Sequence, residues 1–382
     1  MKKISVIFGT RPEAIKLCPI IKELKQNFDI ATEVCVTAQH RHMLDQVLGI
    51  FNIVPDVDLD LMRNNQTLAE FTAKAIELLD DYLKTEKPDI VLIQGDTTTV
   101  FCAAISAFYN HIPIAHVEAG LRTGNLNSPW PEEANRILTS RLALIHFAPT
   151  VTNKQNLIAE GINRDNILIT GNTVIDSLLT TVEHIKQHIP LIAGLPKGNL
   201  DFLGTKKFIL ITSHRRENFG QGLENICLAI IDLIRIFPDI HFIYPVHLNP
   251  NVKETVNRIL GSKISSQETN RIHLIPPQDY SAFVFLMYKS LIILTDSGGV
   301  QEEAPSLGKP VLVLRNTTER TEAEESGCAK LIGTKRQEIV NEVKSLLLDD
   351  DKYRSMVVTA NPFGDGLASK RIAGKLISYL LS

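Results

Sequence analysis

Acidic, basic and glycine-rich turns of this sequence stand where a strand is expected to end and a helix to begin. The octapeptide Gly9–Lys16 directly follows a short apolar run that is typical of a buried strand. Thr10 and Glu13 have the Thr-x-x-Glu spacing of a capping box. A helix N-terminus attracts anions, so one interpretation is a phosphate site with Arg11 and Lys16 beside it. The alternative is an ordinary turn whose arginine forms a surface ion pair.

A second turn of this kind lies at Ser297-Gly298-Gly299, after another apolar run. Its unobstructed N–H groups at the start of a helix suit a diphosphate. Glu303, one turn into that helix, is placed to accept two ribose hydroxyls, although a solvated helix face is the alternative. The segment is not a P-loop, because Gly308-Lys309 is followed by proline, and no GxGxxG is present to indicate a nicotinamide or flavin cofactor.

Three carboxylates in the first half, Asp96, Glu118 and Glu132, stand in loops near Gly, Pro or Trp. If they converge, burial and mutual repulsion would raise the pKa of at least one of them, as proton transfer requires. For any one of them alone, a capping or ion-pair role is favoured over catalysis, and Asp96 before three threonines is a candidate helix N-cap.

His214 follows an apolar run and precedes two arginines, where it would donate to a phosphate or act as an acid. His40, His42 and His116 give no metal-ligand spacing, and we expect no metal. The five cysteines are widely spaced and form no CxxC pair, which indicates neither a zinc site nor a disulfide framework.

Short β-rich runs alternate with helical patterns along most of the chain, which predicts parallel sheets covered by helices on both faces. A Pro- and Gly-rich stretch at about residues 188–207 interrupts the alternation, and we interpret it as an inter-domain or peripheral region. We expect an N-terminal Rossmann-like domain over 1–170, joined by a C-terminal helix at 366–382, and a second over 171–365. Strands are predicted at 4–8, 32–36, 89–93, 112–117, 166–170, 208–212, 240–245, 271–274, 291–295 and 310–314.

The composition excludes several classes of protein. At 382 residues, with a net charge of −3 and 44% hydrophobic residues, the chain is expected to be a soluble, cytoplasmic two-domain protein. Lys/Arg runs are too short for a nucleic-acid surface, no apolar run approaches a membrane span, and we expect no signal peptide.

The motifs together resemble those of the bacterial non-hydrolysing UDP-N-acetylglucosamine 2-epimerases. The resemblance runs from about residue 4 to residue 366 and rests on segments 8–16, 95–99, 116–122, 128–133, 214–217, 295–308 and 317–320. It implies a GT-B-like fold of two Rossmann-like domains whose parallel sheets face a central cleft, a homodimer, and interconversion of UDP-GlcNAc and UDP-ManNAc without a cofactor for cell-envelope polysaccharide.

The resemblance also implies roles for individual residues. It places the catalytic groups at Asp96, Glu118, Glu132 and His214. It places substrate contacts at Arg11, Lys16, Gln278, Phe283, Ser297, Gly298, Gly299, Glu303 and Arg320. An activator site for UDP-GlcNAc is implied at Gln39, His40 and Arg41, and we expect it to be weakened because His42 and Asn65 replace residues of some relatives. Gln94 stands where the family often has His, and Thr321 where it often has Pro.

The C-2 hydrogen of an N-acetylhexosamine is not α to a carbonyl, so loss of the C-1 substituent must accompany its removal. The family reaction, elimination of UDP to 2-acetamidoglucal and re-addition on the other face, meets this requirement. The alternatives are a hydrolysing 2-epimerase that releases ManNAc and UDP, a GT-B glycosyltransferase, and a catalytically silent nucleotide-sugar-binding module. The last would have no need for three carboxylates in the first half.

Overall fold

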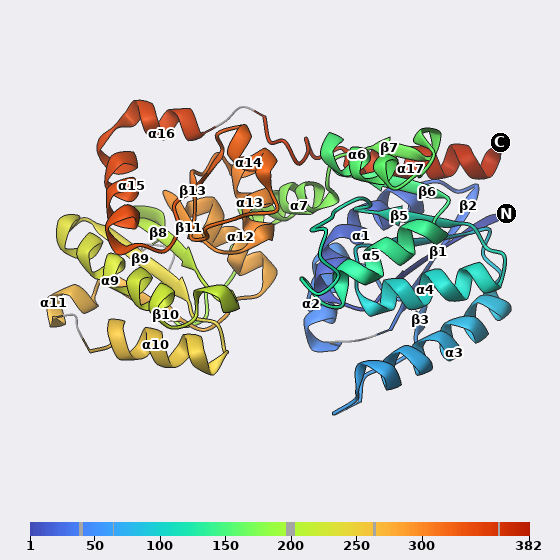
Figure 1. Cartoon of the computed structure of the whole chain (residues 1–382), viewed down its shortest axis with the longest axis horizontal. Coiled ribbons are helices and arrows are strands. Elements are labelled where there is room, and N and C mark those ends of the chain that lie inside the picture. Colours follow the sequence, from blue (N-terminus) through green and yellow to red (C-terminus); the bar gives the residue numbers. More distant parts are fainter. Residues whose placement is uncertain (38–40, 64, 196–202, 263–264, 358–359) are drawn as a thin grey trace. The chain divides into compact units, whose positions relative to one another are not determined.

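The computed structural model describes residues 1–37, 41–63, 65–195, 203–262, 265–357 and 360–382. The chain folds into two compact units, which Figure 1 shows with the elements labelled. Unit 1 comprises Met1–Leu179 and Phe363–Ser382, and unit 2 comprises Thr180–Pro362. Helix α7 (Thr173–Gln187) begins in unit 1 and ends in unit 2.

Unit 1 contains a seven-stranded sheet in the order β3-β2-β1-β4-β5-β6-β7, and every pairing is parallel. Its central strands are buried and apolar, as a sheet covered on both faces requires. Their bounds are β1 Lys2–Phe8, β2 Ile30–Val36, β3 Val57–Asp58, β4 Ile90–Gln94, β5 Ile114–Val117, β6 Ile145–Ala148 and β7 Ile167–Ile169.

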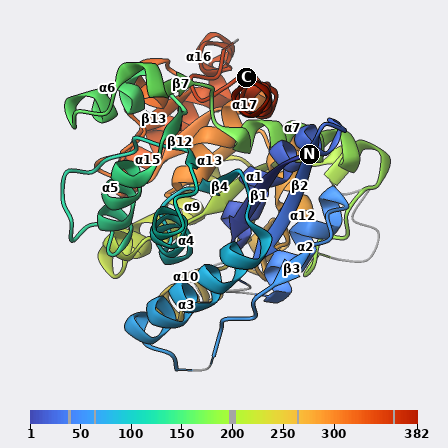
Figure 2. The same ribbon diagram turned by 90° about the vertical axis from the view of Figure 1, so that its right-hand side faces the viewer.

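The helices of unit 1 form two groups. Helix α4 packs against both α3 and α5, whereas α1 packs against α2 and α17. Figure 2 shows strands β1 and β4 with α3 and α4 to one side and α2 to the other. The bounds are α1 Arg11–Lys25, α2 Arg41–Phe51, α3 Leu68–Glu86, α4 Thr98–Tyr109, α5 Glu132–Leu142, α6 Val151–Ala159 and α17 Ala368–Leu381, with a 3₁₀ turn at Arg164–Asn166.

Unit 2 contains a six-stranded parallel sheet in the order β10-β9-β8-β11-β12-β13. Helix α9 packs against α10 and α15 over one apolar cluster, and α12 contacts strand β8. The strands are β8 Lys207–Thr212, β9 Ile240–Pro245, β10 Ile272–Ile275, β11 Ile292–Thr295, β12 Val311–Val313 and β13 Ala329–Leu331. The helices are α9 Gln221–Ile236, α10 Pro250–Leu260, α11 Ser266–Thr269, α12 Tyr280–Lys289, α13 Gly298–Glu303, α14 Thr321–Glu325, α15 Arg336–Leu348 and α16 Asp350–Met356, with 3₁₀ turns at Arg216–Asn218 and Ala304–Leu307.

The predicted fold class, two α/β units with parallel sheets, is confirmed. All ten predicted strands are present with ends shifted by at most two residues, but β3, β6 and β13 were missed. Strand β3 has two residues, β13 contains Ala and Lys, and β6 contains a histidine, so none carries a strong local β signal. Pairing with neighbouring strands stabilises these three segments in the folded chain.

Candidate active site

A buried carboxylate closes the first strand-to-helix turn. Thr10 caps α1 and Glu13 completes the predicted capping box. Glu13 Oε2 accepts hydrogen bonds from the N–H groups of Gly9, at 2.9 Å, and Thr10, at 2.7 Å. Its Oε1 accepts one from the Thr97 hydroxyl at 2.6 Å. Burial raises the pKa of Glu13, against these hydrogen bonds, which lower it. Two N–H groups of this turn are therefore used within the protein, which leaves the half-buried Arg11 as the group best suited to meet an anion there.

Glu118 follows strand β5 and lies at the centre of a polar cluster. Its φ of +63° is a left-handed conformation that is uncommon for a residue with a side chain. Lys16 Nζ lies 2.6 Å from both Oε atoms of Glu118, and Asn172 Nδ2 donates to Oε1 at 3.4 Å. Gln94 Nε2 also donates to Glu118. Lys16, which the resemblance assigns to the substrate, thus holds a carboxylate, and Gln94 contributes a neutral donor to the same group.

Asp96 lies one strand away, in the loop after β4. Arg136 Nε donates to its Oδ2 at 3.0 Å, and a second guanidinium nitrogen forms a closer contact. Burial raises the pKa of Asp96, Arg136 opposes this, and the charge of Glu118 raises it further. Asp96 and Glu118 therefore interact electrostatically, as an acid–base pair requires. The N-cap alternative for Asp96 is wrong, because Thr97 caps helix α4.

Arg136 and Glu133 were missed by the sequence analysis. Arg136 is buried, and its Nη1 donates to Glu133 Oε2 at 3.0 Å. Glu133 also accepts the backbone N–H groups of Thr123 and Gly124, at 3.0 and 2.9 Å. The i, i+3 spacing of the glutamate and arginine on one helix was the available signal. Glu132 is the half-buried first residue of α5, and among the described residues of unit 1 no hydrogen bond links its side chain to this cluster.

In unit 2, the glycines of the predicted diphosphate loop are packed by an arginine. Ser297 is the N-cap of α13, and Gly298 and Gly299 open that helix. A Cβ at Gly298 would lie 2.7 Å from Cζ of Arg320, so the guanidinium rests directly on this glycine. Glu302 Oε1 accepts from Arg320 Nε at 2.9 Å, which fixes the guanidinium. The structure therefore brings together two motifs that are separated by about twenty residues in the sequence.

Two of the three predicted nucleoside contacts already have partners within unit 2. The buried Glu303 accepts a hydrogen bond from the Tyr280 hydroxyl at 3.2 Å. The side-chain amide of Gln278 accepts from Ala193 N at 3.1 Å and donates to Ala193 O at 3.0 Å. Phe283 lies in α12 and is half-buried. A uracil recognised by the Gln278 amide would have to compete with this backbone pair.

His214 lies in the loop after β8, beside the loop that follows the neighbouring strand β11. Its backbone N–H donates to the buried Asp296, and its ring stacks on that of His247 with centroids 5.3 Å apart. Burial lowers the pKa of His214, Asp296 raises it, and His247 and Arg215 lower it further. Arg215 Nε is buried and forms no hydrogen bond within the described residues. A histidine and an arginine thus lie together near the α13 N-terminus.

The predicted activator residues cannot be placed. Gln39 and His40 lie outside the described residues, and Arg41 is the first residue of α2, with its side chain outside them.

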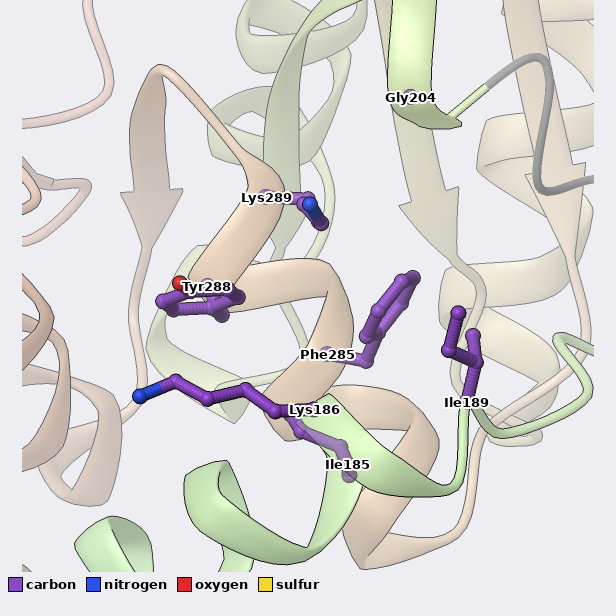
Figure 3. A pocket seen from close by; sticks show the side chains of 7 residues that line it. All are labelled: Ile185, Lys186, Ile189, Gly204, Phe285, Tyr288 and Lys289. Carbon is purple, nitrogen blue, oxygen red and sulfur yellow. The ribbon is translucent and has the colours of Figure 1, made fainter.

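A separate hollow of about 340 Å³ lies between α7 and α12 in unit 2 (Figure 3). Lys289 Nζ lies 5.8 Å from the ring centre of Phe285 and 5.6 Å from that of Tyr288. The lining contains no carboxylate or histidine and none of the predicted site residues: Ile185, Lys186, Ile189, Gly204, Phe285, Tyr288 and Lys289. The carboxylates and the histidine of the candidate site therefore lie in the strand-end loops and not in this hollow. Within the described ranges, no three His, Cys, Asp or Glu side chains are grouped to hold a metal ion, and no helix is long and apolar enough to cross a membrane.

Comparisons with known proteins agree over nearly the whole chain. Residues 22–377 match the family model described as UDP-N-acetylglucosamine 2-epimerase. The Escherichia coli K12 protein of that name is 53% identical over 381 residues, which is 100% of both chains.

Solved structures give the same result. The Neisseria meningitidis UDP-GlcNAc 2-epimerase, crystallised with UDP-GlcNAc, matches with a TM-score of 0.87 and 49% identity over 98% of this chain and 100% of that one. The Methanocaldococcus jannaschii enzyme, in complex with UDP-GlcNAc and UDP, matches with a TM-score of 0.78 and 34% identity over 99% of both.

Proposed function

Because this chain belongs to the UDP-N-acetylglucosamine 2-epimerase family, we propose that it interconverts UDP-GlcNAc and UDP-ManNAc by non-hydrolytic elimination and re-addition of UDP. The observation that carries the mechanism is the neighbouring carboxylates Asp96 and Glu118, held by Arg136 and Lys16 respectively. The charge of Glu118 raises the pKa of Asp96, which suits Asp96 to hold a proton that it can donate.

In this proposal the residues of unit 1 act on C-2 of the sugar. A carboxylate removes the C-2 proton as the C-1 to oxygen bond breaks, and 2-acetamidoglucal is formed. Re-addition of UDP with protonation on the other face gives the epimer. Asp96, Glu118 and Glu132 supply the proton-transferring groups, and Arg136 and Lys16 hold two of them in place.

The residues of unit 2 bind UDP and stabilise the charge that builds on the departing diphosphate. The α13 N-terminus at Ser297, Gly298 and Gly299 offers backbone N–H groups, while Arg320 and His214 offer cationic donors. Glu303 is assigned to the ribose, and Gln278 and Phe283 to the uracil. Arg11 of unit 1 adds a further cation.

Proton NMR of the purified protein with UDP-GlcNAc tests the function. We expect UDP-ManNAc to appear without added metal or NAD, with the gluco epimer in excess. Accumulation of free ManNAc and UDP would instead identify the hydrolysing reaction. Inertness until a sugar acceptor is added would identify a glycosyltransferase, and binding with no turnover would identify a silent module.

Isotope exchange tests the elimination. In D₂O, both epimers should acquire deuterium at C-2, and oxygen-18 in the C-1 bridging position should scramble into the β-phosphate. Both results require complete cleavage of the C-1 to oxygen bond. Epimerisation that retains the original C-2 hydrogen and the bridging label would contradict this route.

The family resemblance also supports a cytoplasmic homodimer that supplies ManNAc units for cell-envelope polysaccharide, and an activator site at Gln39, His40 and Arg41. We propose that this activator site is weak, because loss of an arginine contact to phosphate costs about 1.5–3 kcal/mol. UDP-ManNAc alone should be converted slowly. The rate of its conversion should rise only when UDP-GlcNAc is added at high concentration. Full activation by trace UDP-GlcNAc in a titration of reverse initial rates would contradict the weakening.

A further inference from the structure

Asp296 is a carboxylate in unit 2 to which the sequence motifs assign no role of its own. It directly follows strand β11 and its side chain is fully buried. Strand β11 pairs with β8, with Thr295 opposite Thr212, so Asp296 lies beside the loop that carries His214. Burial of a carboxylate is unfavourable unless its oxygens are saturated with hydrogen bonds.

The two oxygens of Asp296 are used differently. Oδ2 accepts four hydrogen bonds, from Ser213 Oγ at 2.9 Å, His214 N at 2.9 Å, Arg215 N at 2.9 Å and Asn218 Nδ2 at 3.0 Å. Oδ1 shares the His214 N–H at 3.1 Å, and it also lies 3.4 Å from Nδ1 of the His214 ring. Thus Oδ2 holds the loop, whereas Oδ1 faces the imidazole.

This contact selects one tautomer of His214. An ionised carboxylate only accepts hydrogen bonds, so the ring nitrogen that faces it is favoured in its protonated form. The distance of 3.4 Å is long for a hydrogen bond, but such contacts often shorten when substrate binds. The other ring nitrogen, Nε2, then carries the free lone pair.

The ring is also held from its face. His247 stacks on it with an interplanar angle of 16°, and the His214 side chain keeps 38% of its surface exposed. His247 Nδ1 accepts the backbone N–H of Asn249 at 3.1 Å, which holds the His247 ring in place. The imidazole of His214 is thus oriented by a carboxylate on one edge and a stacked histidine ring on one face.

We propose that Asp296 is a positioning residue that keeps the His214 proton on Nδ1, so that Nε2 is the atom that takes up a proton from solvent and donates a hydrogen bond to the diphosphate of the substrate. The second half of this statement rests on the proposed function, whereas the tautomer does not. As the diphosphate anion binds, Nε2 takes up a proton from water, and the resulting N–H donates to the phosphate oxygen that gains charge when the C-1 to oxygen bond breaks. The proton returns to water when UDP re-adds.

The competing interpretation is that Asp296 only holds the loop of residues 213–218 in place through its hydrogen bonds. The variant Asp296→Asn separates the two, because its carbonyl oxygen still accepts from the loop backbone, whereas its NH₂ group facing Nδ1 favours the Nε2-protonated tautomer. Ser213→Ala is the matched control, because it removes one hydrogen bond to Oδ2 and leaves Oδ1 beside the ring.

The first measurement is the tautomer in the unliganded, ¹⁵N-histidine-labelled protein, by long-range ¹H–¹⁵N correlation, with His214→Gln assigning the signals. We expect the Nδ1-protonated form in the wild type and in Ser213→Ala. An Nε2-protonated wild type would overturn the proposal, even if Asp296→Asn fails to fold.

The second measurement is the pH profile of kcat. Loss of the Asp296 charge lowers the pKa of His214, so the alkaline limb should move to lower pH in Asp296→Asn and kcat should fall by roughly 10²–10⁴-fold, as for a carboxylate that orients a catalytic histidine. Ser213→Ala should keep the wild-type profile. A folded Asp296→Asn variant with the wild-type His214 tautomer and the wild-type pH profile of kcat would overturn the proposal, because Asp296 would then only hold the loop of residues 213–218. A wild type that shows the expected tautomer but no epimerisation would reject the proposed function and retain the positioning.

Discussion

The candidate sites of the two units use different chemical groups. In unit 1 the chemistry lies in side chains, since Asp96, Glu118, Lys16 and Arg136 form a network of opposed charges. In unit 2 the predicted anion site is a helix N-terminus, with Arg320 resting on Gly298. Charged side chains can change protonation and exchange protons, whereas backbone N–H groups can only donate. The difference indicates that unit 1 is suited to proton transfer and unit 2 to holding a fixed negative charge.

The largest expected effect comes from neutralising the carboxylates of unit 1. Asp96→Asn, Glu118→Gln and Glu132→Gln should each lower kcat by ~10²-fold or more, because each removes a proton-transferring group. UDP affinity, measured by calorimetry, should stay nearly intact.

Glu86→Gln is the matched control for these variants. Glu86 is also paired with a lysine, Lys3, at 2.8 Å, but it lies at the end of α3 that precedes β4. Its kcat should be close to that of the wild type. If the three unit 1 variants lose UDP binding yet keep turnover at saturation, the assignment of proton transfer to unit 1 and UDP binding to unit 2 is wrong.

A second prediction concerns the buried histidine of strand β6. Burial lowers the pKa of His146 from 6.5 to about 4. The unfolded chain therefore binds more protons between pH 6.5 and about 4, and the free energy of unfolding falls as the pH falls through this window. At pH 5 the loss is about 2 kcal/mol relative to pH 7.5.

His146→Leu should remove this contribution to the fall in the free energy of unfolding between pH 7.5 and pH 5, whatever its effect on stability at pH 7.5. Urea unfolding at both pH values measures the difference. His111→Leu, at an exposed position, should retain the wild-type dependence. An unchanged dependence in His146→Leu would show that this residue is not responsible for the acid sensitivity.

The smallest effect is expected at the glycine of unit 2. In Gly298→Ala the new Cβ would lie 2.7 Å from Arg320 Cζ, so the guanidinium must move away from the α13 N-terminus. Loss of one charge-assisted contact should weaken UDP binding about tenfold, with kcat at saturation less affected.

Gly49→Ala is the control, because a Cβ there meets nothing within 4 Å. Its UDP affinity should equal that of the wild type in the same calorimetric titration. Unchanged UDP affinity in Gly298→Ala would remove Arg320 from the nucleotide site.

The sequence by itself determined the alternation of strands and helices, the capping box at Thr10 and Glu13, and the segments that carry chemistry. These are local properties, since hydrophobic period, cap spacing and glycine position act over a few residues. The family resemblance then located the candidate site residues without any geometry.

Tertiary structure alone decided which groups meet. Strands β4 and β5 place Asp96 near Glu118, and helix α5 brings the unpredicted Arg136 to Asp96. Strands β8 and β11 are neighbours in the sheet although about eighty residues separate them, and this pairing sets Asp296 beside His214. Local patterns cannot specify such contacts, because they depend on the order in which strands pair and on charges that are buried only when the whole unit is folded.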